Sequence, residues 1–185
     1  MTLVFASPLY PPDLAEPAPY TKELARRLST THTVIVVAYG RLPEKVPGAQ
    51  IIAVNKRRPL PWRLAVFTKT LWQVTRNADV LYVQNGASVE LPALITTFFL
   101  RKPLIVHMGD DRAHERAKRS LLHGFLERAV LRRAYAVVRE SPLERPEILP
   151  LHNKPEAEIR AWEESWTRHC SKLEDIFESA RKKHG

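Results

Sequence analysis

Six polar or charged side chains follow apolar runs of this sequence, at positions where they could bind a hydroxyl-bearing ligand. The runs at 3–6, 80–83 and 104–106 are short and continuously apolar, which is typical of buried β-strands, and His107 comes directly after the last of them. In an open parallel sheet, ligands bind at the edge formed by the carboxyl ends of the strands. Carboxylates, an amide and an imidazole can hydrogen-bond hydroxyl groups there. The candidate ligand-binding residues are Asp13, Asn85, Glu90, His107, Asp110 and Asp111.

Several candidates also have an explanation in which they only stabilise the fold. Asp13 comes after two prolines and suits a turn. His107 can be a structural histidine that ends a buried strand. Either Asp110 or Asp111 can cap a following helix, because the helix dipole favours negative charge at an N-terminus. The residue types alone leave both explanations open.

Residues 84–90 combine features of a turn with features of a binding site. Asn85-Gly86 suits a tight turn, and Ser88 can cap the helix expected after it. Asn85 and Glu90 can equally face a bound ligand. For residues 84–90 the sequence supports a structural role in a turn and a role in ligand binding equally.

Residues 56–63 form a basic segment that contains Trp62, and the helix expected at 113–133 adds further basic residues. Basic and aromatic residues together suit an anionic membrane surface. Each cation near such a surface contributes roughly 1 kcal/mol, and tryptophan favours the interface. The alternative is a solvated basic surface. Nucleic acid is disfavoured as a specific partner, because no recognition motif accompanies the charge. The candidate membrane- or anion-binding residues are Lys56, Arg57, Arg58, Trp62, Arg63, Lys118 and Arg119.

Other common chemistries lack their motifs. The first apolar run is not followed by the glycine-rich dinucleotide fingerprint, and the chain has only 6 glycines. It contains no phosphate-binding P-loop and no nucleophile elbow. One cysteine, Cys170, and scattered histidines do not make a zinc site. We therefore expect neither a metal nor a cofactor.

The elements that must position these residues alternate between strands and helices. Such alternation predicts an α/β fold, a Rossmann-like doubly wound parallel sheet of about six strands with the neighbour order 3-2-1-4-5-6. The strands are expected at 3–6, 33–38, 51–54, 80–83, 104–107 and 136–138, and the helices at 20–29, 62–76, 89–100 and 113–133.

The end of the chain has a different character. Four prolines between 141 and 155 indicate an extended connector, and residues 156–183 follow a helical pattern. Trp162, Trp166 and Leu173 lie on its apolar stripe, which would be a costly exposed patch, so we expect the helix to dock on the sheet. The expected division is 1–140, a Rossmann-like domain; 141–155, a connector; and 156–185, a C-terminal helix.

Charge and apolar length indicate partners and compartment. The formal net charge is +9, which favours anionic partners. The sequence shows neither a signal peptide nor an apolar stretch of the roughly 20 residues that a membrane span needs. A cytoplasmic location is expected, extending to the inner face of the membrane if the basic segment binds there.

Residues 1–140 resemble the N-terminal domain of retaining glycosyltransferases of the GT-B fold, glycosyltransferase family 4. The resemblance rests on the order and spacing of four segments, at 7–13, 20–25, 79–86 and 102–110. In that family the N-terminal domain holds the acceptor, and a second Rossmann-like domain holds the nucleotide-sugar. The last helix of the family packs back on the first domain, and residues 162–177 resemble it.

The resemblance assigns roles to individual residues. It implies that His107 faces the cleft and contacts the donor sugar, as the candidate catalytic residue. It also implies that the loop at 7–19, residues 84–90 and residues 107–111 hold acceptor groups.

The chain departs from the family pattern at two places. The loop at 7–19 lacks the paired glycines that let backbone approach donor phosphates, and Glu16 would repel phosphate. The family also carries two donor-site glutamates with seven residues between them. Glu156 and Glu164 have that spacing but lie on one polar helical stretch, so we expect a solvated helix face.

We therefore expect the acceptor-binding half of a glycosyltransferase, without the donor domain and inactive alone. Its expected partners are a nucleotide-sugar, bound weakly, a sugar or lipid-linked acceptor, an anionic membrane surface, and a donor domain or a second copy. The alternatives are a non-catalytic module that binds a sugar, nucleotide or lipid head group, and an engineered minimal scaffold.

Overall fold

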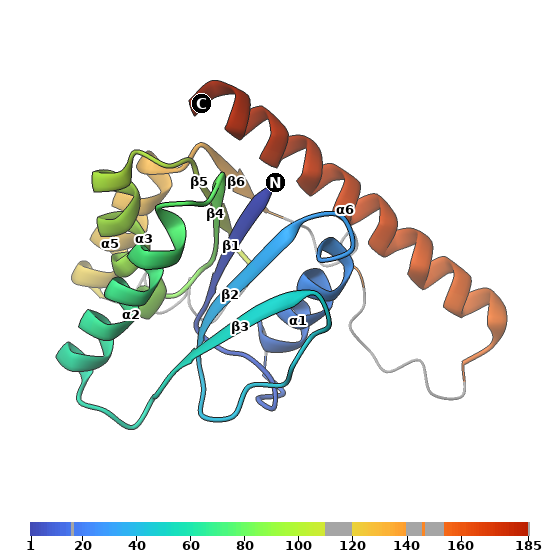
Figure 1. The fold of residues 1–185 in the computed structure, drawn as a ribbon, viewed down its shortest axis with the longest axis horizontal. Coiled ribbons are helices and arrows are strands. Elements are labelled where there is room, and N and C mark those ends of the chain that lie inside the picture. The colour runs from blue at the N-terminus through green and yellow to red at the C-terminus, as the bar shows by residue number, and fades with distance from the viewer. Residues whose placement is uncertain (16, 110–119, 140–145, 147–153, 185) are drawn as a thin grey trace.

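The fold is a single parallel sheet of six strands with helices on both faces (Figure 1). The computed structural model describes residues 1–15, 17–109, 120–139, 146 and 154–184. The strand order is β3-β2-β1-β4-β5-β6, which confirms the expected order. The strands are β1 (Thr2–Ser7), β2 (Thr33–Tyr39), β3 (Ala49–Val54), β4 (Val80–Gln84), β5 (Leu104–His107) and β6 (Ala136–Val138).

The helices form one layer on each face of the sheet. One layer contains α1 and α6, and the other contains α2, α3 and α5 (Figure 1). No helix connects β2 to β3, because residues 40–48 run as a loop. The helices are α1 (Ala18–Leu28), α2 (Leu60–Thr75), α3 (Ala87–Leu100), α5 (Leu121–Arg133) and α6 (Glu156–His184).

Two apolar cores lie on the two faces of the sheet. Leu3 and Phe5 of β1 pack toward α1 and α6, whereas Val4 and Ala6 pack toward α2 and α3. This alternation follows from the two-residue period of a strand. Because both faces are covered, the central strands are apolar throughout, and this is why their positions are readable from the sequence.

The C-terminal helix docks on the sheet as expected. Trp166, Leu173 and Phe177 of α6 are almost completely buried. Arg27 of α1 secures the contact: its guanidinium carbon lies 4.8 Å from the ring centre of Trp162, and its Nη1 lies 2.8 Å from Oε2 of Glu163. Helix α6 is therefore part of the folded body.

Two expected helix starts are wrong. Helix α3 begins at Ala87 after Gly86, so Ser88 lies inside the helix and does not cap it. The helix expected at 113–133 is not continuous, because Ser120 has extended backbone angles (φ −129°, ψ 121°) and caps α5. Its hydroxyl oxygen accepts a hydrogen bond from the backbone N–H of His123 at 3.4 Å. Local side-chain bonding at these turns outweighs the helical pattern.

Candidate functional site

The candidate residues gather at the carboxyl ends of β1, β4 and β5. Gln84 and His107 are register partners at the ends of β4 and β5. The backbone N–H of Asn85 donates to the carbonyl of His107 at 2.9 Å, which extends the ladder by one residue. Asn85 and His107, expected at one site from the sequence, are therefore neighbours.

His107 is fully buried at this edge. Its Nδ1 lies 2.7 Å from Oε1 of Gln84. A carboxamide oxygen only accepts, so Nδ1 carries the proton and donates. The imidazole stacks on the ring of Tyr20, with 4.7 Å between ring centres and 11° between planes. In this arrangement the ring presents no surface to a ligand, and the catalytic role of His107 stays a prediction.

Tyr20 connects three elements beneath the edge. Its hydroxyl lies 3.0 Å from the hydroxyl of Tyr82 on β4 and 2.7 Å from Nε2 of His169 on α6. All three side chains are buried. Sequence reasoning missed this cluster. The apolar stripe of α6 located the helix face, but nothing in the sequence singled out His169 on it.

Asp13 and Lys56 form an ion pair that sequence reasoning treated as two separate sites. Nζ of Lys56 lies 2.5 Å from Oδ2 of Asp13, and their side chains are 37% and 42% exposed. Asp13 also occupies a turn, since its backbone N–H donates to the carbonyl of Tyr10 at 3.2 Å. Among the candidate ligand-binding residues that the structure describes, this pair includes the one that solvent reaches, Asp13.

The loop that carries Asp13 is anchored at both ends. The hydroxyl of Ser7 donates to the carbonyl of Leu9 at 2.6 Å. At the other end the hydroxyl of Thr21 donates to the carbonyl of Pro17 at 3.0 Å and to Oγ of Ser7 at 3.3 Å. Pro17 precedes α1 as its N-cap and fixes the entry into the helix. These contacts hold Asp13 at a defined place beside β3.

Glu90 points inward and stabilises the start of α3. Its Oε1 accepts a hydrogen bond from the backbone N–H of Gly86 at 3.0 Å, and the residue is 5% exposed. Burial raises the pKa of this carboxyl; the bond from Gly86 opposes the shift, and the nearby charge of Glu127 adds to it. Glu90 therefore reaches back from the first turn of α3 to Gly86, the residue that precedes the helix.

Gly86 fits a position that a larger residue would strain. Its φ is +150°, and a Cβ there would lie 3.4 Å from Cγ of Pro8 in the loop after β1. The tight turn expected at Asn85-Gly86 thus also packs against the loop that carries Asp13.

The basic segment divides into inward and outward residues. Arg63 turns inward, with its guanidinium carbon 5.1 Å from the ring centre of Tyr39 and its Nη1 donating to the carbonyl of Lys56 at 3.3 Å. Arg57, Arg58 and Trp62 face outward, and Trp62 is 56% exposed. The guanidinium carbon of Arg58 lies 5.8 Å from the ring centre of Trp62. These three side chains form an exposed surface that is both basic and aromatic.

Four expected site residues lie outside the described part of the chain: Asp110, Asp111, Lys118 and Arg119.

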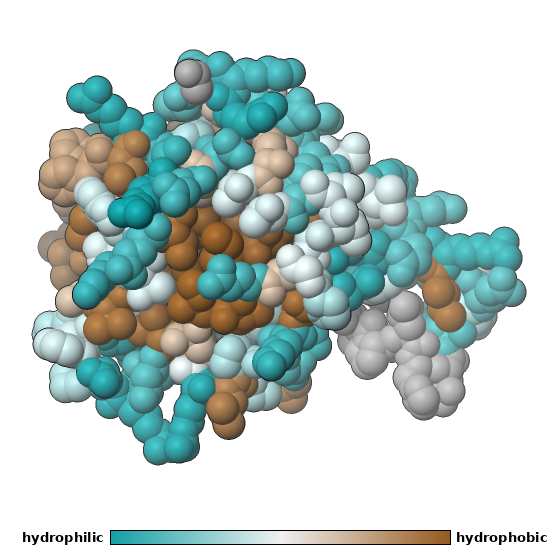
Figure 2. Space-filling view, viewed as in Figure 1, coloured by the Kyte–Doolittle hydropathy of each residue, from teal (hydrophilic) through white to brown (hydrophobic). Residues whose placement is uncertain are grey.

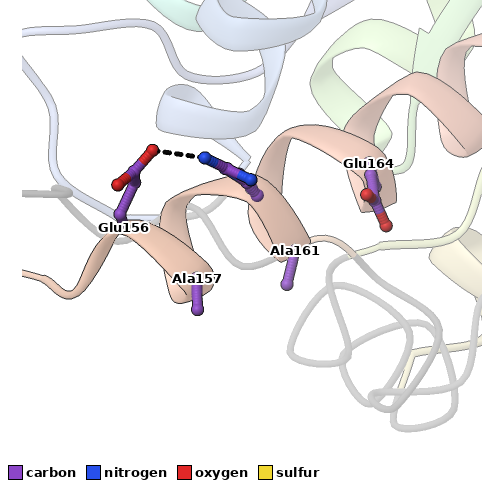
Figure 3. A pocket seen from close by; sticks show the side chains of 5 residues that line it. Glu156, Ala157, Ala161 and Glu164 are labelled. Atoms are coloured by element: carbon purple, nitrogen blue, oxygen red, sulfur yellow. Dashed lines mark hydrogen bonds and ion pairs between the residues drawn. The ribbon is translucent and has the colours of Figure 1, made fainter.

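Glu156 and Glu164 of α6 lie on the exposed side of the helix. Glu156 points toward Arg160, whose Nη2 lies 2.5 Å from its Oε1, while Ala157 and Ala161 point away from this pair (Figure 3). Together with Glu164 these side chains line an open hollow of about 450 Å³. Glu156 and Glu164 are both exposed, as expected of a solvated face.

The part of the chain that the structure describes contains neither a metal-binding cluster nor a membrane-spanning helix. There, no group of three or more histidine, cysteine, aspartate or glutamate side chains could hold a metal ion. Among the same residues, no helix is both long and apolar enough to cross a bilayer.

One family model matches most of the chain. Residues 16–161 match a family described as the glycosyl transferase 4-like domain. A comparison with curated proteins gave no match.

Several solved structures are similar to this chain at low sequence identity. A putative UDP-N-acetylglucosamine 2-epimerase from Listeria monocytogenes is 15% identical, with a TM-score of 0.49 over 76% of this chain and 39% of that chain. The Anabaena protein Alr3699/HepE in complex with UDP is 14% identical, with a TM-score of 0.46 over 78% of this chain and 48% of that one. This chain therefore spans less than half the length of either protein.

Proposed function

Because this chain belongs to the glycosyl transferase 4-like domain family, we propose that it is the acceptor-binding half of a glycosyltransferase. It holds a sugar or a lipid-linked acceptor, and a separate domain brings the nucleotide-sugar. In this proposal residues 1–140 are the acceptor-type domain, 141–155 the connector, and 156–185 the returning helix. The observation that carries the proposal is the accessible Asp13–Lys56 pair at the carboxyl edge of the sheet.

The ion pair supplies two complementary contacts. The carboxylate of Asp13 accepts a hydrogen bond from an acceptor hydroxyl, and the ammonium of Lys56 pairs with a phosphate. A phosphate-linked acceptor would engage both groups at once. The anchored loop supports this role, because a preorganised site loses less entropy on binding.

Two features support weak donor binding. The loop at 7–19 has no glycine, so backbone cannot easily approach phosphates. The described residues also form one sheet, whereas the family resemblance assigns most nucleotide contacts to a second domain.

We expect millimolar or weaker binding of nucleotide-sugars, which corresponds to about −4 kcal/mol or less favourable. Much of the rate of group transfer comes from holding both reactants together, so turnover by this chain alone should be undetectable.

The outward face of the basic segment supports a membrane-bound acceptor. Arg57, Arg58 and Trp62 flank Lys56, so a lipid head group at their surface lies near the ion pair. The chain then acts as a peripheral protein at the inner face of the membrane.

A second candidate is a binding module without chemistry. The burial of His107 favours it, because a fully buried imidazole does not touch a reacting sugar. The two candidates differ in what a donor domain adds. A half-enzyme gains turnover when a donor domain is supplied, and a binding module does not.

The test is a turnover assay with a panel of nucleotide-sugars, run with and without a separately produced donor domain of the same family. Acceptor binding is measured in parallel on the wild-type chain and on Asp13→Asn. We expect no turnover from the chain alone, turnover with the donor domain, and at least tenfold weaker acceptor binding in the variant. Robust turnover by the chain alone refutes the half-enzyme, and acceptor binding that Asp13→Asn leaves unchanged refutes the site.

A further inference from the structure

Strand β3 lies at one edge of the sheet. It pairs with β2 on one side only (Figure 1). The loop at 40–48, which replaces a crossover helix, leaves its faces partly open. Among the described residues β3 pairs with no strand on its other side.

The outer side of β3 presents backbone groups ready for pairing. The carbonyl of Val54 accepts from the N–H of Gly40, so Val54 directs its backbone toward β2. In a parallel ladder alternate residues face alternate sides, so Ile51 and Ala53 direct their N–H and C=O groups outward. In the part of the chain that the structure describes, no hydrogen bond to these outward groups is formed.

The strand lacks the features that usually prevent edge pairing. Natural edges carry charges, prolines or bulges, whereas β3 reads Ala49-Gln50-Ile51-Ile52-Ala53-Val54. Gln50 is exposed, and Ile51 and Ile52 are part-exposed. Figure 2 shows apolar surface gathered over the β2–β3 side of the sheet. An apolar, uncharged edge of this kind favours addition of another strand.

A hollow beside the strand widens the apolar surface. It measures about 700 Å³ and lies next to Ala49 and Ile51, with Leu42, Pro43, Lys45, Val46 and Pro47 as its other walls. Leu42 is 78% exposed at its rim. Pairing at β3 would therefore bury side chains as well as backbone.

We propose that β3 pairs antiparallel with β3 of a second copy of this chain, with Ile52 opposite Ile52 across a two-fold axis. Ile51 then faces Ala53 of the second copy, and the outward groups of both residues form about four hydrogen bonds. Centring the pair on Ile51 instead would set Ala49 opposite Ala53, and the cross-linking experiment below distinguishes the two registers.

A second copy fits this edge better than a foreign peptide. The strand is uncharged, so two identical strands meet without repulsion. A two-fold interface repeats every contact, so the pairing places the hollows of both copies along the same interface. This repetition helps the interface approach the roughly 800 Å² per partner that stable association needs.

Cross-linking tests the register. All variants carry Cys170→Ala, so that the added cysteine is the only thiol. Ile52→Cys places two thiols at a non-hydrogen-bonded pair, where Cα atoms lie about 4.5 Å apart, which suits a disulfide. The matched control is Gln50→Cys, whose two copies lie about 13 Å apart in this register. With molecular oxygen as the oxidant, we expect at least tenfold more covalent dimer from Ile52→Cys.

The oligomeric state tests the edge itself, by sedimentation over a range of concentrations. We expect the wild-type chain to dimerise and Gln50→Lys to raise the dimer dissociation constant at least tenfold. Gln73→Lys makes the same change at an exposed position of α2 and should leave the dissociation constant unchanged. Ala53→Pro should act like Gln50→Lys, since it removes only an outward N–H. The proposal is overturned if the wild-type chain is monomeric, or if Gln50→Lys and Gln73→Lys change the dissociation constant equally. It is also overturned if Gln50→Cys yields as much covalent dimer as Ile52→Cys.

Discussion

The hydroxyl oxygen of Tyr20 lies 2.7 Å from Nε2 of His169, although 149 positions separate them in the sequence. Tyr20 also stacks on His107 at the end of β5. The C-terminal helix is thereby connected through one tyrosine to the carboxyl edge of the sheet. Disturbing α6 should therefore affect both stability and the site.

Trp166→Ala should strongly destabilise the fold. Trp166 is fully buried against α1 and the sheet, and removal of a large buried aromatic side chain typically costs about 3–5 kcal/mol. Urea denaturation followed by circular dichroism gives the free energy of unfolding. Trp62→Ala is the control: Trp62 is 56% exposed, so its loss should cost about 0.5 kcal/mol or less. Equal stability of the Trp166 variant and wild type would mean that α6 is not docked.

Tyr20→Phe and His169→Phe should show coupled effects on stability. Either change removes the hydrogen bond between the two buried side chains, at about 0.5–1.5 kcal/mol each. Once one partner is gone the second change costs less, so the double mutant should fall short of the sum by about 0.5–1.5 kcal/mol. Tyr20→Phe combined with Gln73→Ala, on the opposite face, should be additive within about 0.5 kcal/mol. Additive effects in the Tyr20–His169 pair would contradict a direct hydrogen bond.

Cys170 should resist alkylation in the folded chain. Burial raises the pKa of its thiol to about 12, with the Arg27 charge opposing, so very little reactive thiolate exists near neutral pH. The rate of reaction with iodoacetamide, measured by mass spectrometry, should rise steeply when urea unfolds the chain. Trp166→Ala should also accelerate it, whereas Trp62→Ala should not. Fast alkylation of the native wild type would show that the buried face of α6 opens frequently.

Glu90→Gln should alter the pH dependence of stability. Burial raises the pKa of Glu90 in the folded chain, so the folded state binds this proton more tightly than the unfolded state. The resulting stabilisation is fully present below the unfolded pKa of about 4.3 and is lost as pH rises through the folded pKa. Glutamine keeps an acceptor for the N–H of Gly86 without this loss.

The measurement is the free energy of unfolding of both proteins between about pH 4 and pH 8. As the pH rises, the free energy of unfolding of Glu90→Gln should increase relative to that of wild type. Glu164→Gln, at an exposed position, serves as the control and should follow wild type. A constant difference between Glu90→Gln and wild type would contradict the raised pKa.

Membrane binding should be electrostatic in large part. Vesicles with anionic lipid should bind the chain more tightly than neutral vesicles, and added salt should weaken the binding by screening. Arg58→Ala should weaken binding about fivefold, as expected for the loss of roughly 1 kcal/mol per cation. Arg76→Ala changes an exposed arginine at the other end of α2 and should leave the binding to vesicles unchanged. Equal binding to both kinds of vesicle, measured by co-sedimentation, would remove the membrane from the proposal.

The sequence predicted the features that depend on burial. Strands such as β1 and β4 are covered on both faces, so their runs are continuously apolar and their places could be predicted. The stripe of Trp166, Leu173 and Phe177 predicted the docked face of α6 in the same way.

Features that depend on contacts between distant elements were not predictable. Asp13 and Lys56 lie 43 positions apart, and only the sheet brings them together. Their residue types suggested two sites, because an ion pair leaves no periodic pattern in a sequence. The inward orientation of the Glu90 side chain was not predictable for a similar reason. A carboxylate at the fourth position of a helix can face either solvent or the N-terminus of that helix.

Both ends of the described chain lie at the amino edge of the sheet. The N–H of Thr2 donates to Asp79, just before β4, at 2.7 Å, and the ring of His184 lies 5.9 Å from that of Tyr135, just before β6. Figure 1 shows N and C at the same end of the fold. Asp13 and His107 belong to the opposite edge. A tether, dye or reporter fused at either end would thus leave the ligand edge unobstructed, so the chain can be immobilised for binding studies without masking it.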